Sequence, residues 1–338
     1  MRKGSVSVIG LLVMAVIILS SSSIMYVTQL QSSIVRSSGI KSQSFYLSEG
    51  KIYKTYYEDK YYKQQLLPII LAEFRRGQFI PFKEITLESS DLEQGDGYKK
   101  VSVNFYDKND KKYINLIANS KYNGIATTAS SHGPLVNELF ELGIPVLSKD
   151  YLNDTYLKNF NVLFSNIKEN IDINKANLLS TIYGIYSFDY DNINIKKAGN
   201  DYEATFFRDN MNLKTQLINK QKVFLLIRNN LNRPVTLSLG SEACENFNLS
   251  GIIYVEGDLR LYSNVKFNGI IIVDNGNIYI DGDTKPIING IILCNGSDNS
   301  FVESLELLYN RDEIYMYGTY IPGFLAPVIE VIKKSKAG

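Results

Sequence analysis

The chain has 338 residues, of which 45% are hydrophobic and 21% are charged. This length and composition accommodate a membrane anchor together with one or two globular domains. The 36 basic residues nearly balance the 35 acidic ones, for a net charge of +1, and the basic residues do not gather in one stripe. The charge pattern therefore argues against a protein that binds nucleic acid.

The N-terminus carries an apolar run long enough to cross a membrane. Residues 6–27 read VSVIGLLVMAVIILSSSSIMYV, and a helix needs about 20 apolar residues to span roughly 30 Å of hydrocarbon. Arg2 and Lys3 precede the run, and the next charged residue is Arg36. This asymmetry predicts a single span with a cytoplasmic N-terminus and an extracellular C-terminal body.

A cleaved secretory signal is the alternative interpretation of this run. Such a signal should end in a small-residue cleavage site followed by polar chain. The serines at 20–23 lie inside the apolar run instead, and Ile24, Met25 and Val27 continue it. We therefore favour a helix within residues 5–80 that spans the membrane over about 6–27 and is amphipathic beyond it. The apolar stripe expected beyond the span consists of Leu30, Ile34, Phe45, Leu47, Ile52 and Tyr56.

The beginning of the chain resembles a known family. Residues 1–4, the apolar helix that starts at Ser5, and the segment SFYLSEG at 44–50 are similar to the N-terminus of type IV pilin-like proteins, above all minor pilins with a PilX-type N-terminal domain. The resemblance implies that a prepilin peptidase cuts after Gly4 and that Ser5, a candidate for N-methylation, becomes the mature N-terminus. It also implies that the helix packs in a filament through Ile9, Leu12, Val16, Leu19, Phe45, Leu47 and Glu49.

Two positions depart from the family pattern. Major pilins usually begin the mature chain with Phe and carry a Glu four positions later, where this chain has Ser5 and Ile9. That Glu pairs with the terminal amine of a neighbouring subunit, an interaction that matters in lipid because isolated charges are costly there. Its absence implies a place at the tip or in initiation rather than along the filament shaft.

The body of the chain carries strand signals. Residues 101–105 and 113–118 alternate apolar and polar residues around a polar turn, which predicts a hairpin with a third strand at 124–129. Residues 135–142 have short helical spacing. Residues 223–227 and 235–239 are interpreted as another pair of strands.

An internal repeat follows. The blocks at 249–259, 267–278 and 288–296 share a Gly-Ile-Ile core, and their glycines Gly251, Gly269 and Gly290 are 18 and 21 residues apart. This spacing predicts a short β-helix (solenoid), and an ordinary sheet of similar short strands is the rival. Stacked blocks would align Ile253, Ile271 and Ile292 in one ladder, and would match Leu259 and Leu261 with Ile278 and Ile280. The opposite apolar face then needs a cover, either the distal part of the N-terminal helix or residues 324–332.

The sequence offers little catalytic chemistry. His132 is the single histidine, and its neighbouring serines do not by themselves make a catalytic triad, so a polar loop residue is the favoured interpretation. No metal-ligand spacing and no phosphate-binding loop is found, and we expect no cofactor and no metal. An exported location permits a disulfide between Cys244 and Cys294, although a buried thiol also behaves as a small apolar residue.

The chain is thus expected to be α+β. It would have a prepilin-type leader at 1–4, a long helix at 5–80, a mixed α/β region at 81–160 and a β-rich region at 161–338 with its repeats at about 247–296. The resemblance implies a non-enzymatic structural subunit of a type IV pilus or related filament, with other pilin-like subunits, the prepilin peptidase and membrane lipid as partners. One alternative is a permanently anchored surface protein whose solenoid binds envelope polysaccharide. Another is a carbohydrate-active enzyme that uses Glu256, Asp258 or Asp274.

Overall fold

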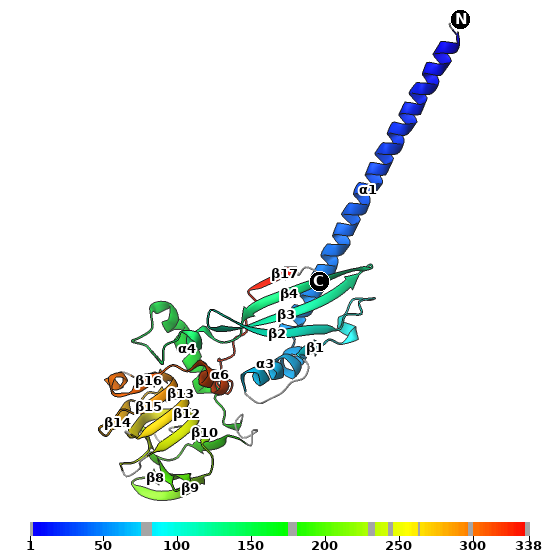
Figure 1. Cartoon of the computed structure of the whole chain (residues 1–338). Coiled ribbons are helices and arrows are strands. Elements are labelled where there is room, and N and C mark those ends of the chain that lie inside the picture. The colour runs from blue at the N-terminus through cyan, green and yellow to red at the C-terminus, as the bar shows by residue number, and fades with distance from the viewer. Residues whose placement is uncertain are drawn as a thin grey trace.

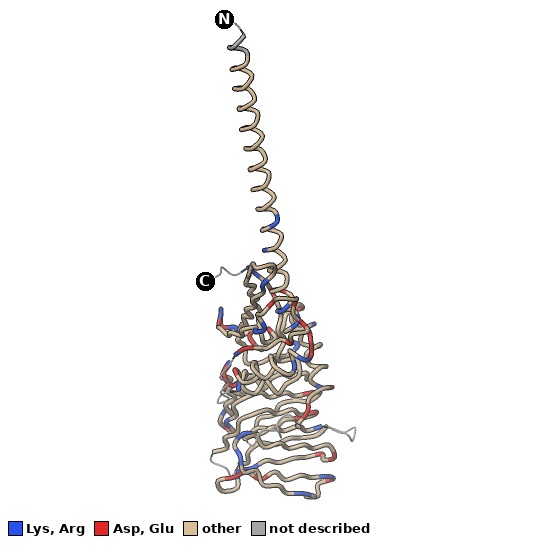
Figure 2. The backbone as a smooth tube through the Cα atoms, turned by 90° about the vertical axis from the view of Figure 1, so that its right-hand side faces the viewer, with Lys and Arg blue, Asp and Glu red and all other residues tan. Residues whose placement is uncertain are grey.

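The computed structural model describes residues 3–75, 83–174, 181–228, 234–242, 246–262, 264–296 and 300–334. A long N-terminal helix, α1 (Lys3–Tyr57), projects from a head that is mostly β (Figure 1). A long helix followed by a mostly β head confirms the α+β class expected from the sequence. The charged residues lie in the head and in the part of α1 next to it, whereas the far part of the helix has none among the described residues after Lys3 (Figure 2).

The helical region at the N-terminus, which extends to Phe74, is not one continuous helix. α1 has 55 residues, which at 1.5 Å per residue makes it about 80 Å long. Glu58 has extended backbone angles and ends it. A short helical turn α2 (Asp59–Tyr61), a π-helical turn η1 (Tyr62–Leu66) and α3 (Leu67–Phe74) follow, with Pro68 in the first turn of α3, where its missing N–H is tolerated. The helix expected over 5–80 is therefore broken at Glu58 and ends at Phe74, and residues 76–80 lie outside the described residues.

An antiparallel sheet lies against the C-terminal part of α1. Its strands follow the order β1-β2-β3-β4-β17, and α1 contacts β3 and β4 most extensively. Its strands have these bounds: β1 Glu84–Thr86, β2 Lys100–Lys108, β3 Lys111–Tyr122, β4 Ile125–Pro134 and β17 Val331–Lys334. The predicted hairpin and third strand are confirmed, and the turn between β2 and β3 places Asn109 and Asp110 at positive φ.

Strand β4 is longer than the sequence pattern indicated. It runs on to Pro134, so His132 lies in a strand and not in a loop. The chain then forms the short 3₁₀ helix η3 (Glu138–Glu141) where a helix over 135–142 was expected, and two further elements, β5 (Val146–Ser148) and α4 (Asp154–Asn170). A 3₁₀ helix at Ser89–Asp91, η2, connects β1 and β2.

The rest of the head is built around parallel strands in two connected sheets. One sheet pairs β6 (Tyr183–Ser187), β10 (Lys222–Ile227), β12 (Phe247–Tyr262), β13 (Val265–Asp274) and β15 (Ile287–Cys294) in that order. The other pairs β7 (Asn192–Ala198), β11 (Val235–Leu239), the second half of β12, and β14 (Ile278–Asp281). β12 belongs to both sheets, and we call these strands together the parallel stack.

The register of the parallel stack matches the register read from the repeats. Gly251 aligns with Gly269 and Gly269 with Gly290, while Ile253, Ile271 and Ile292 form one ladder. Leu259 lies opposite Ile278, and Leu261 opposite Ile280, as expected. One pairing was wrong: β10 and β11 do not pair with each other, because each pairs with a different half of β12.

Further elements extend and cover the parallel stack. The antiparallel hairpin β8 (Asp201–Arg208) and β9 (Met211–Ile218) continues the second sheet beyond β7. At the opposite end lie β5, β16 (Glu306–Leu308) and the 3₁₀ helix η4 (Ser300–Ser304), followed along the chain by α6 (Arg311–Gly318).

Alternate residues of the Gly-Ile-Ile strands enter two different cores. Ile253, Ile271 and Ile292 pack between the two parallel sheets. Ile252, Ile270 and Ile291 face the other way and share a core with Ile314 of α6, with Phe324 and with the buried face of α4. The second apolar face is thus covered by α6, α4 and the Phe324 region, and α1 contacts the antiparallel sheet instead.

Candidate functional site

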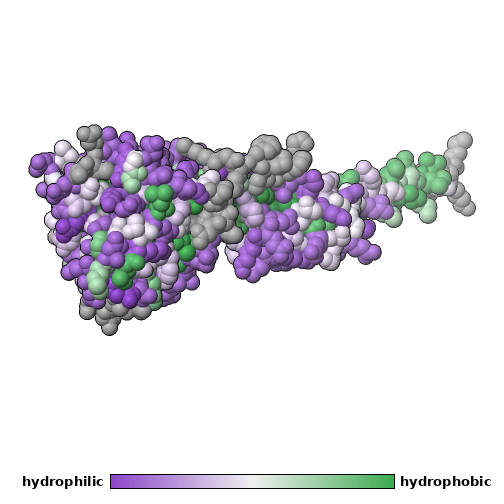
Figure 3. All heavy atoms as spheres, turned by 90° about the horizontal axis from the view of Figure 1, so that it is seen from below, coloured by the Kyte–Doolittle hydropathy of each residue, from purple (hydrophilic) through white to green (hydrophobic). Residues whose placement is uncertain are grey.

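The first half of α1 exposes apolar side chains over its whole circumference. Every described residue from 7 to 39 is exposed, including these four predicted filament-packing residues: Ile9 at 62%, Leu12 at 64%, Val16 at 53% and Leu19 at 71%. The segment Ser7–Tyr57 is long and apolar enough for one membrane span. Seen from below, the projecting helix is green where the head is mainly purple (Figure 3).

The predicted processing site lies at the start of this helix. Gly4 and Ser5 belong to the first turn of α1, which begins at Lys3. Cleavage after Gly4 and methylation of Ser5 remain predictions from the resemblance.

The second half of α1 attaches to the antiparallel sheet through small polar side chains. Ser44, Ser48, Lys51 and Thr55 are buried at helical spacing, together with Ile52 and Tyr56. The Ser44 hydroxyl donates to the carbonyl oxygen of Ser120 at 3.0 Å, and the Ser48 hydroxyl donates to that of Thr127 at 3.1 Å. The Thr127 hydroxyl in turn donates to the Ser44 oxygen at 2.9 Å. Small side chains allow the helix axis to approach the strands closely.

Lys51 forms a buried ion pair at this junction. Its ammonium lies 2.8 Å from Oδ2 of Asp96, with the two side chains only 4% and 0% exposed. It also donates to the carbonyl oxygens of Tyr98 at 2.6 Å and Asn119 at 2.7 Å. Burial lowers the pKa of Lys51, and the Asp96 carboxylate opposes that shift. The ammonium is thus matched by three acceptors.

The sequence pattern identified only part of this face. Of the predicted stripe, Ile52 and Tyr56 are buried and Phe45 and Leu47 are half-buried, but Leu30 and Ile34 are 45% and 59% exposed. Glu49 is also half-buried. Ser44, Ser48, Lys51 and Thr55 were missed because polar residues at helical spacing usually indicate a solvated face. The recurrence of Ser at 44 and 48 is the signal that could have found them.

A second charged cluster fixes the chain just after α1. Asp91 lies between Lys60 at 2.5 Å and Lys54 at 3.1 Å, and the hydroxyl of Tyr61 also donates to it. These contacts, Lys60 first, hold the pKa of the Asp91 carboxyl well below its usual range. The cluster connects the break at Glu58 to η2.

The three repeat glycines occupy positions where only glycine fits. Their φ angles are +137° at Gly251, +138° at Gly269 and +159° at Gly290. A Cβ atom added at any of them would overlap the backbone carbonyl oxygen of the neighbouring strand. Both the backbone angle and the close approach therefore require glycine here.

The acidic residues considered as catalytic groups have structural contacts. Asp274 is 1% exposed and is bound by Lys168 at 2.7 Å and the side-chain amide of Asn295 at 3.1 Å. Glu256 lies 3.5 Å from Arg228, and Asp258 accepts from the backbone N–H of Asn277 at 2.9 Å. The Asp274 and Arg228 contacts tie the end of α4 to the parallel stack, since Arg228 also donates to the Lys168 carbonyl oxygen.

The cysteine and histidine predictions have different outcomes. Cys294 is buried in the core of the parallel stack, but Cys244 lies outside the described residues, so their pairing remains a prediction. His132 lies 3.2 Å from the Tyr106 hydroxyl through its Nδ1. Within the described ranges, no group of three or more His, Cys, Asp or Glu side chains could hold a metal ion.

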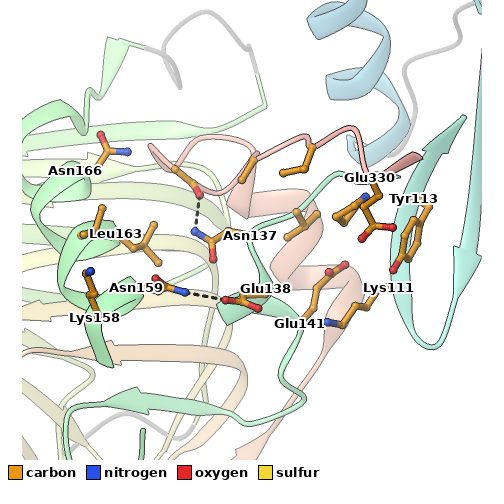
Figure 4. Close-up of a pocket in the computed structure, with 16 residues that line it drawn as sticks. Lys111, Tyr113, Asn137, Glu138, Glu141, Lys158, Asn159, Leu163, Asn166 and Glu330 are labelled. Atoms are coloured by element: carbon orange, nitrogen blue, oxygen red, sulfur yellow. Dashed lines mark hydrogen bonds between the residues drawn. The ribbon is translucent and has the colours of Figure 1, made fainter. Parts of the chain in front are cut away.

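A groove of about 540 Å³ lies between the antiparallel sheet and α4. Figure 4 shows its two walls: Lys111, Tyr113 and Glu330 come from the sheet side, and Lys158, Leu163 and Asn166 come from α4. Asn159 also comes from α4, and Asn137 and Glu138 lie between the two walls (Figure 4). The side-chain amide of Asn159 donates to Glu138 at 2.8 Å, and that of Asn137 to the carbonyl oxygen of Gly323 at 3.3 Å.

No model of a known protein family, no curated protein and no solved structure matches this chain.

Proposed function

We propose that this chain is a non-enzymatic structural subunit of a type IV pilus or a related filament. The observation that carries the proposal is the division of α1. Its first half projects from the head with every described side chain from residue 7 to 39 exposed, whereas its second half is fixed to an antiparallel sheet (Figure 1). The head is displayed outside the cell.

An exposed apolar helix of this length needs an apolar environment both before and after the subunit is assembled into a filament. Full burial of one Leu, Ile or Val side chain stabilises by about 1.5–3 kcal/mol, and this half of the helix carries many such side chains. Lipid supplies the environment before assembly. The apolar helices of neighbouring subunits supply it within a filament, and this accounts for the same residues serving first as anchor and then as packing surface.

The residue at position 9 supports a place at the tip or in initiation. Ile9 is an exposed apolar residue on α1 where the resembling family carries the Glu that pairs with a neighbour's amine. The helix of a neighbouring subunit can still pack against a subunit without this carboxylate. The ion pair with the neighbour's terminal amine, which would be repeated along a shaft, cannot form. This subunit is therefore expected in few copies per filament.

We also propose that the parallel stack is a short β-helix that acts as the displayed part of the head. The support is the register of its strands, in which equivalent residues of successive repeats lie side by side in two sheets. Its interior is filled by aliphatic and aromatic side chains.

The proposal is tested by asking where the native protein resides. Cells are sheared, filaments are separated from membranes, and both fractions are analysed by quantitative mass spectrometry. A filament subunit is expected in the sheared fraction together with other pilin-like proteins. Recovery from membranes alone, in cells that assemble filaments, would contradict the proposal and favour a permanently anchored surface protein.

A further inference from the structure

The groove beside α4 combines polar side chains of both signs with an apolar floor. Its volume of about 540 Å³ falls in the range of about 300–1,000 Å³ that is typical of small-molecule sites. Val136 and Leu163 on its lining are buried and apolar. Lys111, Lys158 and Glu330 form no ion pair with any residue that the structure describes. Lys158 is therefore available to a ligand, whereas Lys111 interacts electrostatically with Glu141, and Glu330 with Tyr106.

The side-chain amides and carboxylates in the groove are held in place by hydrogen bonds within the protein. Asn137 accepts from the backbone N–H of Leu139 and donates to Gly323, and Asn159 donates to Glu138. Glu141 accepts from the Tyr315 hydroxyl and from the backbone N–H of Lys112. Held amides and carboxylates of this kind can donate to and accept from vicinal hydroxyl groups without losing much side-chain freedom.

Aromatic rings extend the groove on the sheet side. Tyr113 lines the groove and stacks on Tyr106, its cross-strand partner, with ring centroids 5.5 Å apart and an interplanar angle of 24°. His132 packs edge-on against Tyr106 at 6.0 Å. The hydroxyl of Tyr113 has no hydrogen-bond partner among the described residues, and Figure 4 shows its ring beside Glu330.

We propose that this groove binds a short oligosaccharide. A sugar ring has one apolar C–H face, which suits the aliphatic floor and the part of the Tyr113 ring that is not stacked on Tyr106. It also has a rim of hydroxyls, which suits the amides and carboxylates. A phosphate-bearing ligand fits less well, because acidic groups from Glu138, Glu141 and Glu330 line the same groove as the two lysines. The inference is independent of filament assembly, since it concerns the head alone.

The test uses the full chain in detergent micelles and three trisaccharide probes. The probes are trimers of N-acetylglucosamine, glucose and galacturonic acid, titrated by isothermal calorimetry. We expect at least one neutral trimer to bind with a Kd tighter than about 1 mM. Tyr113→Ala should weaken that binding by more than about tenfold, and Asn159→Ala by about three- to tenfold.

Two matched variants control for non-specific effects. Tyr279→Ala removes an exposed tyrosine of β14 and Asn212→Ala an exposed asparagine of β9, both outside the groove. Both should bind like the unaltered protein. Tyr113→Phe keeps the ring and should retain most of the affinity, which separates the contribution of the ring from that of the hydroxyl, and the melting temperature of Tyr113→Ala shows whether that variant is folded.

Three results would overturn the inference. The first is that none of the trimers binds more tightly than about 1 mM. The second is binding that Tyr113→Ala and Tyr279→Ala weaken equally. The third is competition for the groove by a displayed peptide library but not by any trimer, which would assign the groove to an extended peptide.

Discussion

Lys51 places a charge inside a helix face that otherwise carries small and apolar side chains. Its ammonium lies 2.8 Å from the Asp96 carboxylate, whose side chain is 0% exposed. Replacing one member of a buried pair leaves the other charge without a partner. We expect Lys51→Met to destabilise the head by about 3–5 kcal/mol in denaturant unfolding of the detergent-solubilised chain.

Lys54→Met is the matched control for this variant. Lys54 lies one turn further along α1, and its side chain is 35% exposed in its ion pair with Asp91. Its loss should cost about 0–1 kcal/mol. Equal losses for the two variants would show that burial of the Lys51–Asp96 pair is not what holds α1 to the sheet.

The folding stability that the charged cluster around Asp91 contributes depends on pH. Because Lys60, Tyr61 and Lys54 lower its pKa in the folded chain, the unfolded chain binds more protons as the pH falls below the ordinary value of about 3.9. The stability that Asp91 contributes is therefore complete above about pH 4 and is lost in acid. The melting temperature of the unaltered protein should exceed that of Asp91→Asn at neutral pH, and the gap should shrink near pH 3. A gap that stays constant over this range would contradict the assigned contacts.

The repeat glycines determine whether neighbouring strands of the parallel stack can approach. A methyl group at Gly269 would overlap the carbonyl oxygen of Gly251 and would also be held at a φ of +138°. The backbone angle alone costs about 1–3 kcal/mol, and separation of β12 from β13 adds to it. Gly269→Ala should therefore lower the midpoint of thermal unfolding strongly. Gly97→Ala, where a Cβ meets nothing within 4 Å, should change it little, and similar midpoints for both variants would be inconsistent with this packing.

The elements that could be predicted from the sequence are those with a local signal. The apolar run of α1 and the β2–β3 hairpin have such signals. The register of the three Gly-Ile-Ile blocks could also be predicted, because aligning the repeats in the sequence places equivalent residues side by side. The pairing of β10 and β11 was wrong because closeness along the chain favours a hairpin, whereas each strand continues a different parallel sheet. The break at Glu58 has no Gly or Pro beside it to indicate it.

The candidate groove could not be predicted from the sequence at all. Its lining comes from β3, η3, α4 and the segment before β17. These pieces are brought together when the chain returns from the parallel stack to pair β17 with β4. Asn137 and Asn159 carry no motif, and their positions depend on tertiary contacts alone.

The two halves of α1 differ in how they expose their side chains. The hydrogen bonds between α1 and the head begin at Ser44, and every described side chain from residue 7 to 39 is exposed. A chain that begins at Arg36 keeps these contacts and loses the apolar segment. It should be monomeric without detergent and should unfold at the same temperature as the head of the full chain. Precipitation of this shortened chain, or a clearly lower unfolding temperature, would show that the head needs the first half of α1.

The proposed pilin-like function predicts which residue begins the native protein. A pilin-like subunit, isolated from cells that make a prepilin peptidase, should begin at Ser5 when measured by intact mass and N-terminal peptide analysis. Gly4→Val should retain the four leader residues, whereas Gly10→Val, the same substitution further along α1, should still be processed. An unaltered protein that keeps its leader, or one that is cut near Ser23, would contradict the proposed pilin-like function.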